Sequence, residues 1–392
     1  MVDSITFHTK NFITYSDEYF TKAEFQELKG KYGVFGRFAV RYTDHYKKCK
    51  KEGRYFPQVN LIARYKMTPQ GAVPTERWLV VQVSLPKIIF GTNIFDMDER
   101  LLSVAAQKIA EALKEIQVAM TVEAILSSIV YRIDYSKMLQ IAASFGTTDR
   151  VLRALAPYDL KQSSDFNRNH YYDGRKGFYL KYYNSSQGLV VYDKFDEIVA
   201  NGKTNLEHAI AREYMAGKWK KGALRFELSI QKKQSVDAML RKFYSEKKKD
   251  FTVKEVARVD IAKACLLKTF DDVYVSDFSR LVRLGGLKEV ELVRLIESAA
   301  ESLNDRAILY YLTHKVREHG LKATVELLKS EVSPATIGRY KRRIETILAD
   351  VEAKKDNVSV VQYLRRKLVV FRPILPTNLQ AILAVADHED KV

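Results

Sequence analysis

Two strand-like runs near the middle of the chain carry side chains suited to metal-assisted phosphoryl transfer. The first, residues 188–199, reads GLVVYDKFDEIV, and the second, residues 223–230, reads ALRFELSI. Period-two alternation places Tyr192 and Lys194 on one face of the first run, and it places Arg225 on the same face as the acid two residues later. A tyrosine attacks a phosphodiester once its oxygen is deprotonated or polarised and nearby cations neutralise the phosphate. The pattern also describes an ordinary amphipathic hairpin with Tyr192 as a surface aromatic, so both interpretations stay open.

Carboxylates near these runs are candidate ligands for a hard cation. Mg²⁺ and Mn²⁺ prefer oxygen ligands, and Asp134, Glu197 and Glu227 lie in or just after strand-like segments that can be neighbours in one sheet. The alternative is structural, with cross-strand ion pairs between Arg225 and Glu227 and between Arg132 and Asp134.

Other catalytic patterns are missing from the sequence. None of the seven histidines forms a His-x-His pair, and His314 and His319 have the wrong spacing for one helical face. Cys49 and Cys265 lack a partner pattern, which predicts neither a disulfide framework nor a zinc site and suits a reducing cytoplasm. The chain contains neither a Gly-x-x-x-x-Gly-Lys-Ser/Thr loop nor a Gly-x-Ser-x-Gly elbow.

Composition favours a globular protein that meets a polyanion. The 392 residues suffice for two or three domains, and a hydrophobic content of 46% argues against disorder. The net charge of +17, with 23 tyrosines beside 65 lysines and arginines, points to nucleic acid. We expect no signal peptide and no membrane span, because the N-terminus lacks a cationic region and no apolar run is long enough.

The chain up to about residue 250 predicts strands with packed helices. A basic stretch, residues 46–56, is predicted as a loop whose cations either track a phosphate backbone or form a solvated face. Pro86 and Gly91 are predicted to end a strand and open a turn. The predicted strands are 3–8, 34–42, 59–65, 78–85, 129–135, 177–183, 190–194 and 224–230, with helices over 98–120 and 196–219. The basic residues of the loop are Lys47, Lys48, Lys50, Lys51 and Arg54.

After about residue 252 the pattern becomes helical. Ser333 is a predicted N-cap with Pro334 in the first helical position, and residues 336–344 resemble the second, basic helix of a helix-turn-helix. Its candidate DNA contacts are Arg339, Lys341, Arg342 and Arg343. The fold class is therefore predicted as α+β, with a mixed or antiparallel sheet in two β-α-β-like halves and a helical C-terminal part. We expect a catalytic domain over residues 1–270 and a DNA-binding domain over 271–392.

Four segments, in order, resemble the signature segments of filamentous-phage gene II type replication initiators, which are in turn similar to plasmid rolling-circle initiators. They are residues 83–93 (VSLPKIIFGTN), 131–135 (YRIDY), 191–197 (VYDKFDE) and 224–227 (LRFE). The resemblance extends over roughly residues 1–380, because residues 333–344 and 371–373 also look like the C-terminal part of that family.

The resemblance implies a protein that nicks one strand of a double-stranded origin through a tyrosine, leaves a free 3′-OH and later rejoins the displaced strand. It implies Tyr192 as nucleophile, Lys194 and Arg225 on phosphate, and Asp134, Glu197 and Glu227 on Mg²⁺ or Mn²⁺. The implied partners are double- and single-stranded origin DNA and the host helicase and polymerase, in the cytoplasm of a bacterial host. The other tyrosines open as nucleophiles are Tyr179, Tyr182 and Tyr183.

Two other functions compete with this one. A non-enzymatic, sequence-specific DNA-binding regulator would use only the basic surface and the C-terminal helices. A tyrosine recombinase would use Tyr340, which follows residues 314–317 (HKVR) at a suggestive distance.

Overall fold

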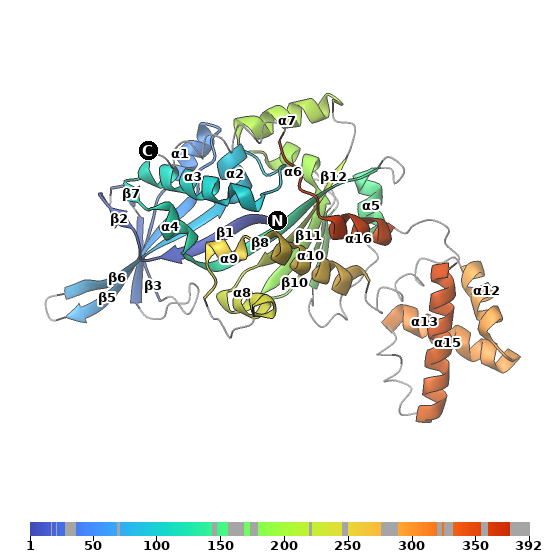
Figure 1. Cartoon of the computed structure of the whole chain (residues 1–392). Coiled ribbons are helices and arrows are strands. Elements are labelled where there is room, and N and C mark those ends of the chain that lie inside the picture. Colours follow the sequence, from blue (N-terminus) through green and yellow to red (C-terminus); the bar gives the residue numbers. More distant parts are fainter. Residues whose placement is uncertain are drawn as a thin grey trace.

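The computed structural model joins an antiparallel sheet with packed helices to a helical C-terminal region, and this confirms the predicted α+β class (Figure 1). It describes residues 1–16, 18–20, 22–27, 37–68, 71–142, 147–155, 168–172, 179–218, 222–244, 250–275, 289–319, 324, 332–353 and 360–376.

Ten strands of the described chain form one sheet in the order β3-β4-β5-β6-β1-β8-β12-β11-β10-β9. Each neighbouring pair is antiparallel. The strands are β1 Val2–Thr9, β3 Lys22–Glu27, β4 Arg37–Tyr42, β5 Gln58–Thr68, β6 Gly71–Ser84, β8 Ile129–Gln140, β9 Arg168–Tyr172, β10 Tyr179–Tyr183, β11 Gln187–Asp193 and β12 Ala223–Ile230. A separate two-stranded ribbon pairs β2 (Ile13–Thr14) with β7 (Val118–Ala119).

Strand β12 lies in the middle of the sheet and alternates as predicted. Leu224, Phe226 and Leu228 are buried in the main hydrophobic core, where the Phe226 ring meets the Phe270 ring edge-on at 5.6 Å. The opposite face carries polar residues, which period-two alternation normally turns toward solvent. Arg225 on that face is nevertheless only 1% exposed. A buried polar face requires internal partners, so this face is the place to look for a site.

Helices cover both faces of the sheet. On the apolar side α10 packs against β8 and β12, whereas on the polar side residues of α6 and α7 pack with Met138 of β8. No described helix is long and apolar enough to cross a membrane. The helices and 3-10 turns up to residue 243 are α1 His45–Lys51, α2 Leu85–Phe90, η1 Glu99–Leu101, α3 Leu102–Lys114, α4 Val122–Leu126, α5 Thr148–Leu155, α6 Lys194–Asn201, α7 Asn205–Met215, α8 Lys233–Leu240 and η3 Arg241–Phe243. Beyond it lie α9 Val253–Val256, α10 Val259–Tyr274, α12 Glu289–Ala299, α13 Leu303–His319, α15 Pro334–Ala353 and α16 Val360–Val370.

Two short segments are helical where the sequence was interpreted otherwise. The predicted basic loop begins with helix α1, which buries Cys49 on its inner face. The predicted turn after β6 is helix α2, in which Pro86 occupies the first turn and Gly91 caps the end with a φ of 72°. Proline favours the first helical turn and glycine the left-handed cap, so these residues delimit a helix. Both helices are too short for periodicity alone to reveal them.

The C-terminal helices pack in two places. Helices α12, α13 and α15 share a small core of their own, which contains Leu292, Leu309 and Ile344, and they lie together beyond the sheet in Figure 1. Helix α15 begins at Pro334, and Ser333 Oγ accepts a hydrogen bond from a first-turn amide, as predicted. Within the part predicted to be helical, residues 276–284 and 321–329 lie outside the described residues, apart from Thr324, and the boundary at residue 270 stays a prediction.

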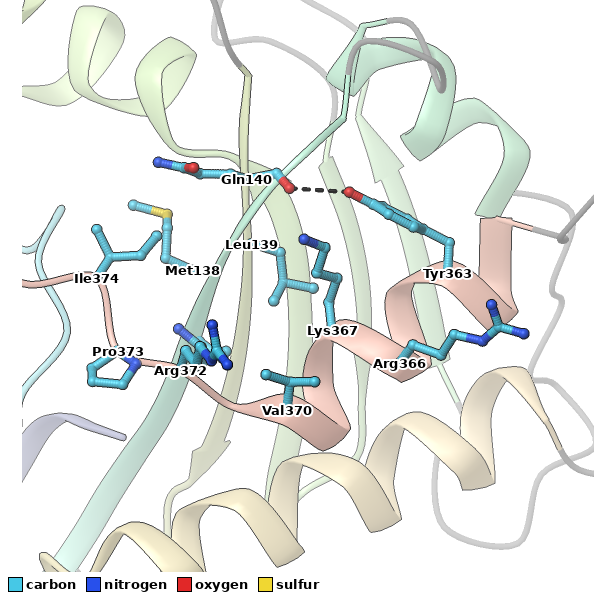
Figure 2. A pocket seen from close by; sticks show the side chains of 11 residues that line it. Met138, Leu139, Gln140, Tyr363, Arg366, Lys367, Val370, Arg372, Pro373 and Ile374 are labelled. Atoms are coloured by element: carbon cyan, nitrogen blue, oxygen red, sulfur yellow. Dashed lines mark hydrogen bonds between the residues drawn. The ribbon is translucent and has the colours of Figure 1, made fainter.

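Helix α16 returns to the sheet. It packs on α10, α5 and β8 and buries Leu364 and Leu368. Arg365 forms a two-pronged ion pair with Asp271 of α10, at 2.7 and 2.8 Å. The hydroxyl of Tyr363 donates to the carbonyl of Gln140 in β8 at 3.2 Å (Figure 2). The end of the described chain is therefore part of the sheet body.

Candidate functional site

The buried polar face of β12 collects most of the residues singled out from the sequence. Across from Arg225 on β11 lies Tyr192, and across from Ser229 on β8 lies Asp134. Residues paired across antiparallel strands share a face of the sheet, so these residues and Glu227 lie on the same side. The structure thus brings together one tyrosine, one arginine and two carboxylates from three adjacent strands.

Tyr192 and Glu227 are joined directly. The Tyr192 hydroxyl donates a hydrogen bond to Oε2 of Glu227 at 3.0 Å. Burial raises the pKa of Tyr192 well above its usual range, and the Glu227 carboxylate raises it further. Burial also raises the pKa of Glu227 to about 7, with additional contributions from the negative charges of Asp3 and Asp134. A carboxyl group with this pKa is suited to accept a proton near neutral pH.

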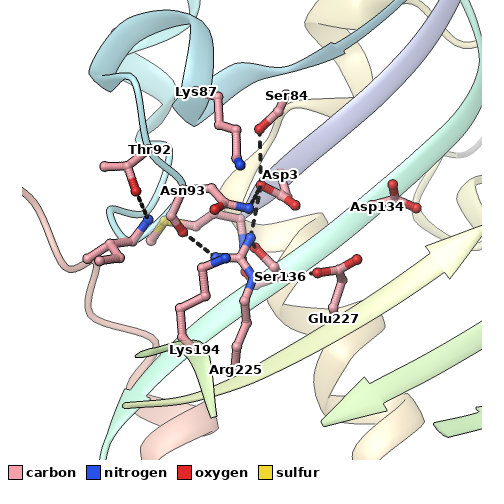
Figure 3. Close-up of polar contacts among 12 residues, drawn as sticks. Asp3, Ser84, Lys87, Thr92, Asn93, Asp134, Ser136, Lys194, Arg225 and Glu227 are labelled. Carbon is pink, nitrogen blue, oxygen red and sulfur yellow. Dashed lines mark hydrogen bonds and ion pairs between the residues drawn. The ribbon is translucent and has the colours of Figure 1, made fainter. Parts of the chain in front are cut away.

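Arg225 is the most enclosed of these side chains, and protein groups surround its guanidinium (Figure 3). Nη2 lies 2.9 Å from Oδ1 of Asp3 and donates to Oγ of Ser136 at 2.8 Å. Nη1 donates to the carbonyl of Asn93 at 2.5 Å, and Nε lies 3.5 Å from Oε2 of Glu227. These contacts hold β1, β8, β12 and the loop after α2 around a single cation.

Nearby cations keep Asp3 ionised. Burial by itself would raise the pKa of Asp3, but the charges of Arg225, Lys194 and Lys87 together outweigh burial and hold that pKa below its usual value. Ser84 and Asn93 also approach Oδ1 of Asp3, each at 3.4 Å. Asp3, Asn93 and Ser136 were not singled out from the sequence. Only Asn93 had a signal, since it ends the first of the four signature segments.

Lys194 is the first residue of helix α6 instead of the last residue of a strand. Asp193 caps this helix, accepting from the amides of Phe195 at 2.8 Å and Asp196 at 3.2 Å. The turn directs Lys194 inward, where its Nζ lies 2.5 Å from Oε2 of Glu197. Burial lowers the pKa of Lys194. Lys194 and Glu197 therefore reach the site together as a pair from the end of β11.

The three predicted metal ligands do not form a closed cage. Asp134 accepts from Ser229 at 2.5 Å and from Arg132 at 3.2 Å, and burial raises its pKa. Glu197 is held by Lys194. Within the described residues, Asp134, Glu197 and Glu227 do not belong to a group of three ligand atoms lying within 4.8 Å of one another. Their assignment as ligands stays a prediction.

Another set of candidate metal ligands in the described residues does lie close together. The ligand atoms of His45, Cys49 and Glu115 are all within 4.8 Å of one another. His45 and Cys49 are one turn apart on α1, so the interpretation of this segment as a loop concealed their spacing. The group is compatible with a metal ion, although Arg54 occupies it. The arginine binds both oxygens of Glu115, at 2.8 and 2.9 Å, and donates to Sγ of Cys49 at 3.1 Å.

The competing tyrosines differ in their accessibility. Tyr182 is fully buried on the apolar face, where its ring meets that of Tyr274 edge-on. Tyr179 lies directly across from Tyr192, and Tyr183 lies on the same face as Tyr179. Only Tyr192 of these tyrosines has a hydrogen bond to a predicted metal ligand within the described part of the chain. Tyr340, the nucleophile of the recombinase hypothesis, is 8% exposed in the core of the C-terminal helices, which argues against that hypothesis.

The predicted DNA-contacting cations divide into two sets. Lys47 pairs with Asp44 at 2.8 Å, Arg54 with Glu115, and Arg343 with Glu301 at 2.5 Å, so protein carboxylates already hold these three cations. The other predicted cations are exposed on α1 and α15, namely Lys48, Lys50, Lys51, Arg339, Lys341 and Arg342.

Comparison with known proteins gives one family match, over part of the chain. Residues 64–249 match the family described as the N-terminal region of a replication-associated protein, the product of phage gene II. Neither the curated proteins nor the solved structures provide a match. The matched segment contains all four signature segments, whereas residues 333–344 and 371–373 lie beyond it, so the resemblance there stays a prediction. The resemblance to filamentous-phage gene II initiators is thus confirmed over residues 64–249, the segment that matches this family of replication-associated proteins.

Proposed function

We propose that this protein initiates rolling-circle replication by nicking one strand of a double-stranded origin and later rejoining the displaced strand. The family match supports a role in replication, with DNA as the partner. The observation that carries the nicking chemistry is the 3.0 Å hydrogen bond from the Tyr192 hydroxyl to Glu227. It joins a nucleophile to a base of suitable pKa on a buried polar face.

In the proposed cleavage, the phenolic oxygen of Tyr192 attacks the scissile phosphorus while its proton passes to Glu227. The bond between phosphorus and the 3′ oxygen breaks, and the leaving oxygen takes up a proton to become a free 3′-OH. The products are a 5′-phosphotyrosine ester and a primer end for a host polymerase. Rejoining reverses the step, since a 3′-OH attacks the ester and Tyr192 recovers its proton.

Two cations have distinct proposed roles. Lys194 is buried at the start of α6 with its Nζ paired to Glu197, and it would contact a phosphate oxygen after leaving that carboxylate. Arg225 is a positioning residue, because Asp3, Asn93 and Ser136 already hold its guanidinium. Its nearness to Glu227 favours the ionised carboxylate and so maintains the base. This role replaces a direct phosphate contact for Arg225.

The donor set of the site fits Mg²⁺ or Mn²⁺. Asp134 and Glu227 offer carboxylate oxygens, and the raised pKa of each reflects burial together with the negative charge of Asp3. Clustered carboxylates that repel one another are the environment that a hard cation stabilises. When bound, such an ion supplies charge neutralisation at the scissile phosphate. Glu197 is the third proposed ligand, after release from Lys194.

DNA binding is proposed to spread beyond this site. The exposed cations of α1 and α15 would contact the origin through its phosphate backbone, which needs no base recognition. The helical part from residue 271 onward would contribute the duplex contacts, and a host helicase and polymerase would act on the nicked product. This assigns the protein to the cytoplasm of a bacterial host.

The decisive experiment uses supercoiled origin DNA with Mg²⁺ or Mn²⁺. We expect wild-type protein to convert it to open circles and to retain a covalent 5′-phosphotyrosine, which peptide mass spectrometry places on Tyr192. Tyr192→Phe should bind the origin with wild-type affinity and leave it uncut, whereas Tyr179→Phe and Tyr183→Phe should cut. An adduct on another tyrosine would overturn the nucleophile assignment. Binding without cleavage by the wild type would favour the non-enzymatic regulator.

A further inference from the structure

A cavity of about 470 Å³ lies between the end of β8 and helix α16 with the segment that follows it, and Figure 2 shows its lining side chains. Its walls come from residues 137–140 and from residues 363–374. Four of its lining residues are lysines or arginines, and no carboxylate of the described chain lines it. One of its lining residues, Met138, lies directly across from Arg225 in the sheet, so the cavity adjoins the polar face of β12.

Three of these cations face solvent, and no carboxylate of the described residues lines the cavity beside them. Arg366, Lys367 and Arg372 are exposed, and neither arginine forms an ion pair within the described residues. The adjacent Arg365 differs, because it is bound to Asp271 and anchors the helix. Nζ of Lys367 lies 5.7 Å from the centre of the Tyr363 ring. Uncompensated positive charges around one cavity create a local potential that attracts an anion.

The cavity walls are held in place by buried contacts. Lys137 is buried and forms an ion pair with Asp96. The Asp96 carboxylate also accepts from the amide of Ile374 at 2.9 Å, and the Asp96 amide donates to the Ile374 carbonyl at 2.8 Å. The chain after α16 is thereby fastened to the loop that carries Asn93, whose carbonyl binds Arg225. The cavity and the nicking site thus border the same loop.

We infer that this cavity binds a single strand of nucleic acid. Arg366, Lys367 and Arg372 would take backbone phosphates, while the apolar side chains of Val370 and Pro373 would meet a sugar or base. Its volume is that of a small-ligand pocket, about 300–1,000 Å³, which admits an unpaired nucleotide but not a duplex. The inference rests on the proposed function, because nicking generates the displaced single strand that such a site would retain.

The test compares binding of a fluorescein-labelled short oligothymidylate to full-length variants by anisotropy across a salt series. The Arg366→Ala/Lys367→Ala/Arg372→Ala variant should bind at least about tenfold more weakly at low salt. The slope of log affinity against log salt should fall by about 2, since each phosphate contact on a single strand contributes roughly 0.7. A matched control removes three exposed lysines elsewhere, as Lys114→Ala/Lys232→Ala/Lys254→Ala, and should change both quantities little.

Unchanged affinity and slope in the cavity variant would overturn the inference, as would weaker binding to a duplex oligonucleotide alone. Equal losses in the cavity variant and the lysine control would also overturn it, because they would show only the effect of net charge. Near-ultraviolet circular dichroism confirms folding, and Arg366→Glu alone should repeat the loss if the triple variant unfolds. Tyr192→Phe should bind oligothymidylate like the wild type. The cleavage assay therefore tests the nicking chemistry, and the anisotropy assay tests this cavity independently.

Discussion

The hydroxyl of Tyr192 lies 3.0 Å from Oε2 of Glu227, although the residue directly across from Tyr192 in the sheet is Arg225. The phenol therefore reaches diagonally along the neighbouring strand, past the arginine, to the acid two residues further on. Because the phenol binds the acid and not the arginine, the guanidinium of Arg225 binds Asp3 on one side and lies 3.5 Å from Glu227 on the other. The proposed nucleophile and its proposed base are therefore in direct contact, with Arg225 beside the base.

The pH dependence of nicking should report Glu227. Its pKa is about 7, so below that pH the carboxyl is protonated and cannot accept the phenolic proton. We expect the single-turnover cleavage rate of the wild type to fall about tenfold per pH unit below 7. The Glu227→Gln variant should cleave roughly 10²–10⁴-fold more slowly, and its cleavage rate should not fall with pH near 7. Tyr179→Phe is the control and should keep the wild-type dependence of cleavage rate on pH. If the rate of Glu227→Gln still falls below pH 7, Glu227 is not the base.

Arg225 should matter for stability as well as for activity. Arg225→Met leaves the buried carboxylate of Asp3 without its cation, which should cost about 3–5 kcal/mol in urea unfolding. Adding Asp3→Asn should recover part of that loss, because the uncompensated charge is removed. Arg132→Met is the matched control, since Arg132 lies on the same sheet face with its side chain 39% exposed, and it should cost about 1 kcal/mol or less. Strictly additive losses in Arg225→Met/Asp3→Asn would contradict the coupling.

His8 should make the fold sensitive to acid. The imidazole is buried and stacks on Tyr131 at 3.7 Å, and burial lowers its pKa to about 3. The unfolded chain, with a histidine pKa near 6.5, therefore binds the proton more tightly than the folded chain. Stability should be fully present above pH 6.5 and should decline as the pH falls toward 3, by on the order of 4 kcal/mol from this residue. His8→Phe keeps a stacked ring and should flatten the decline in thermal melting, and an unchanged difference between pH 7 and 4 would refute this.

Arg54 should control metal binding at His45, Cys49 and Glu115. Its guanidinium binds both oxygens of Glu115 and the sulfur of Cys49, so an added cation would meet a positive charge there. We expect Arg54→Ala to bind Co²⁺ more tightly than the wild type, with a thiolate-to-metal absorption band. Arg54→Ala/Cys49→Ser should lose that band. If the wild type binds Co²⁺ as tightly as Arg54→Ala does, Arg54 does not block metal binding by His45, Cys49 and Glu115.

Local sequence patterns predicted many of the strands and helices. The alternation of residues 224–230 predicted a strand with one apolar and one polar face, and Ser333 before Pro334 predicted where α15 begins. These features depend on neighbours within a few residues, which the sequence displays directly. The order of the four signature segments likewise pointed to the replication-initiator family, which the match over residues 64–249 confirms.

The sequence by itself thus determined which residue types were available, and only the tertiary structure decided which of them meet. Asp3 reaches Arg225 because β1 pairs with β8 and β8 with β12, and no local pattern encodes that strand order. The same packing buries Arg225 on the polar face and encloses Tyr182 on the apolar face. It also accompanies a helix, where a basic loop was predicted, that brings Cys49 to Glu115. Periodicity records which face a side chain takes, whereas burial, pKa and partners arise from contacts between segments far apart in the chain.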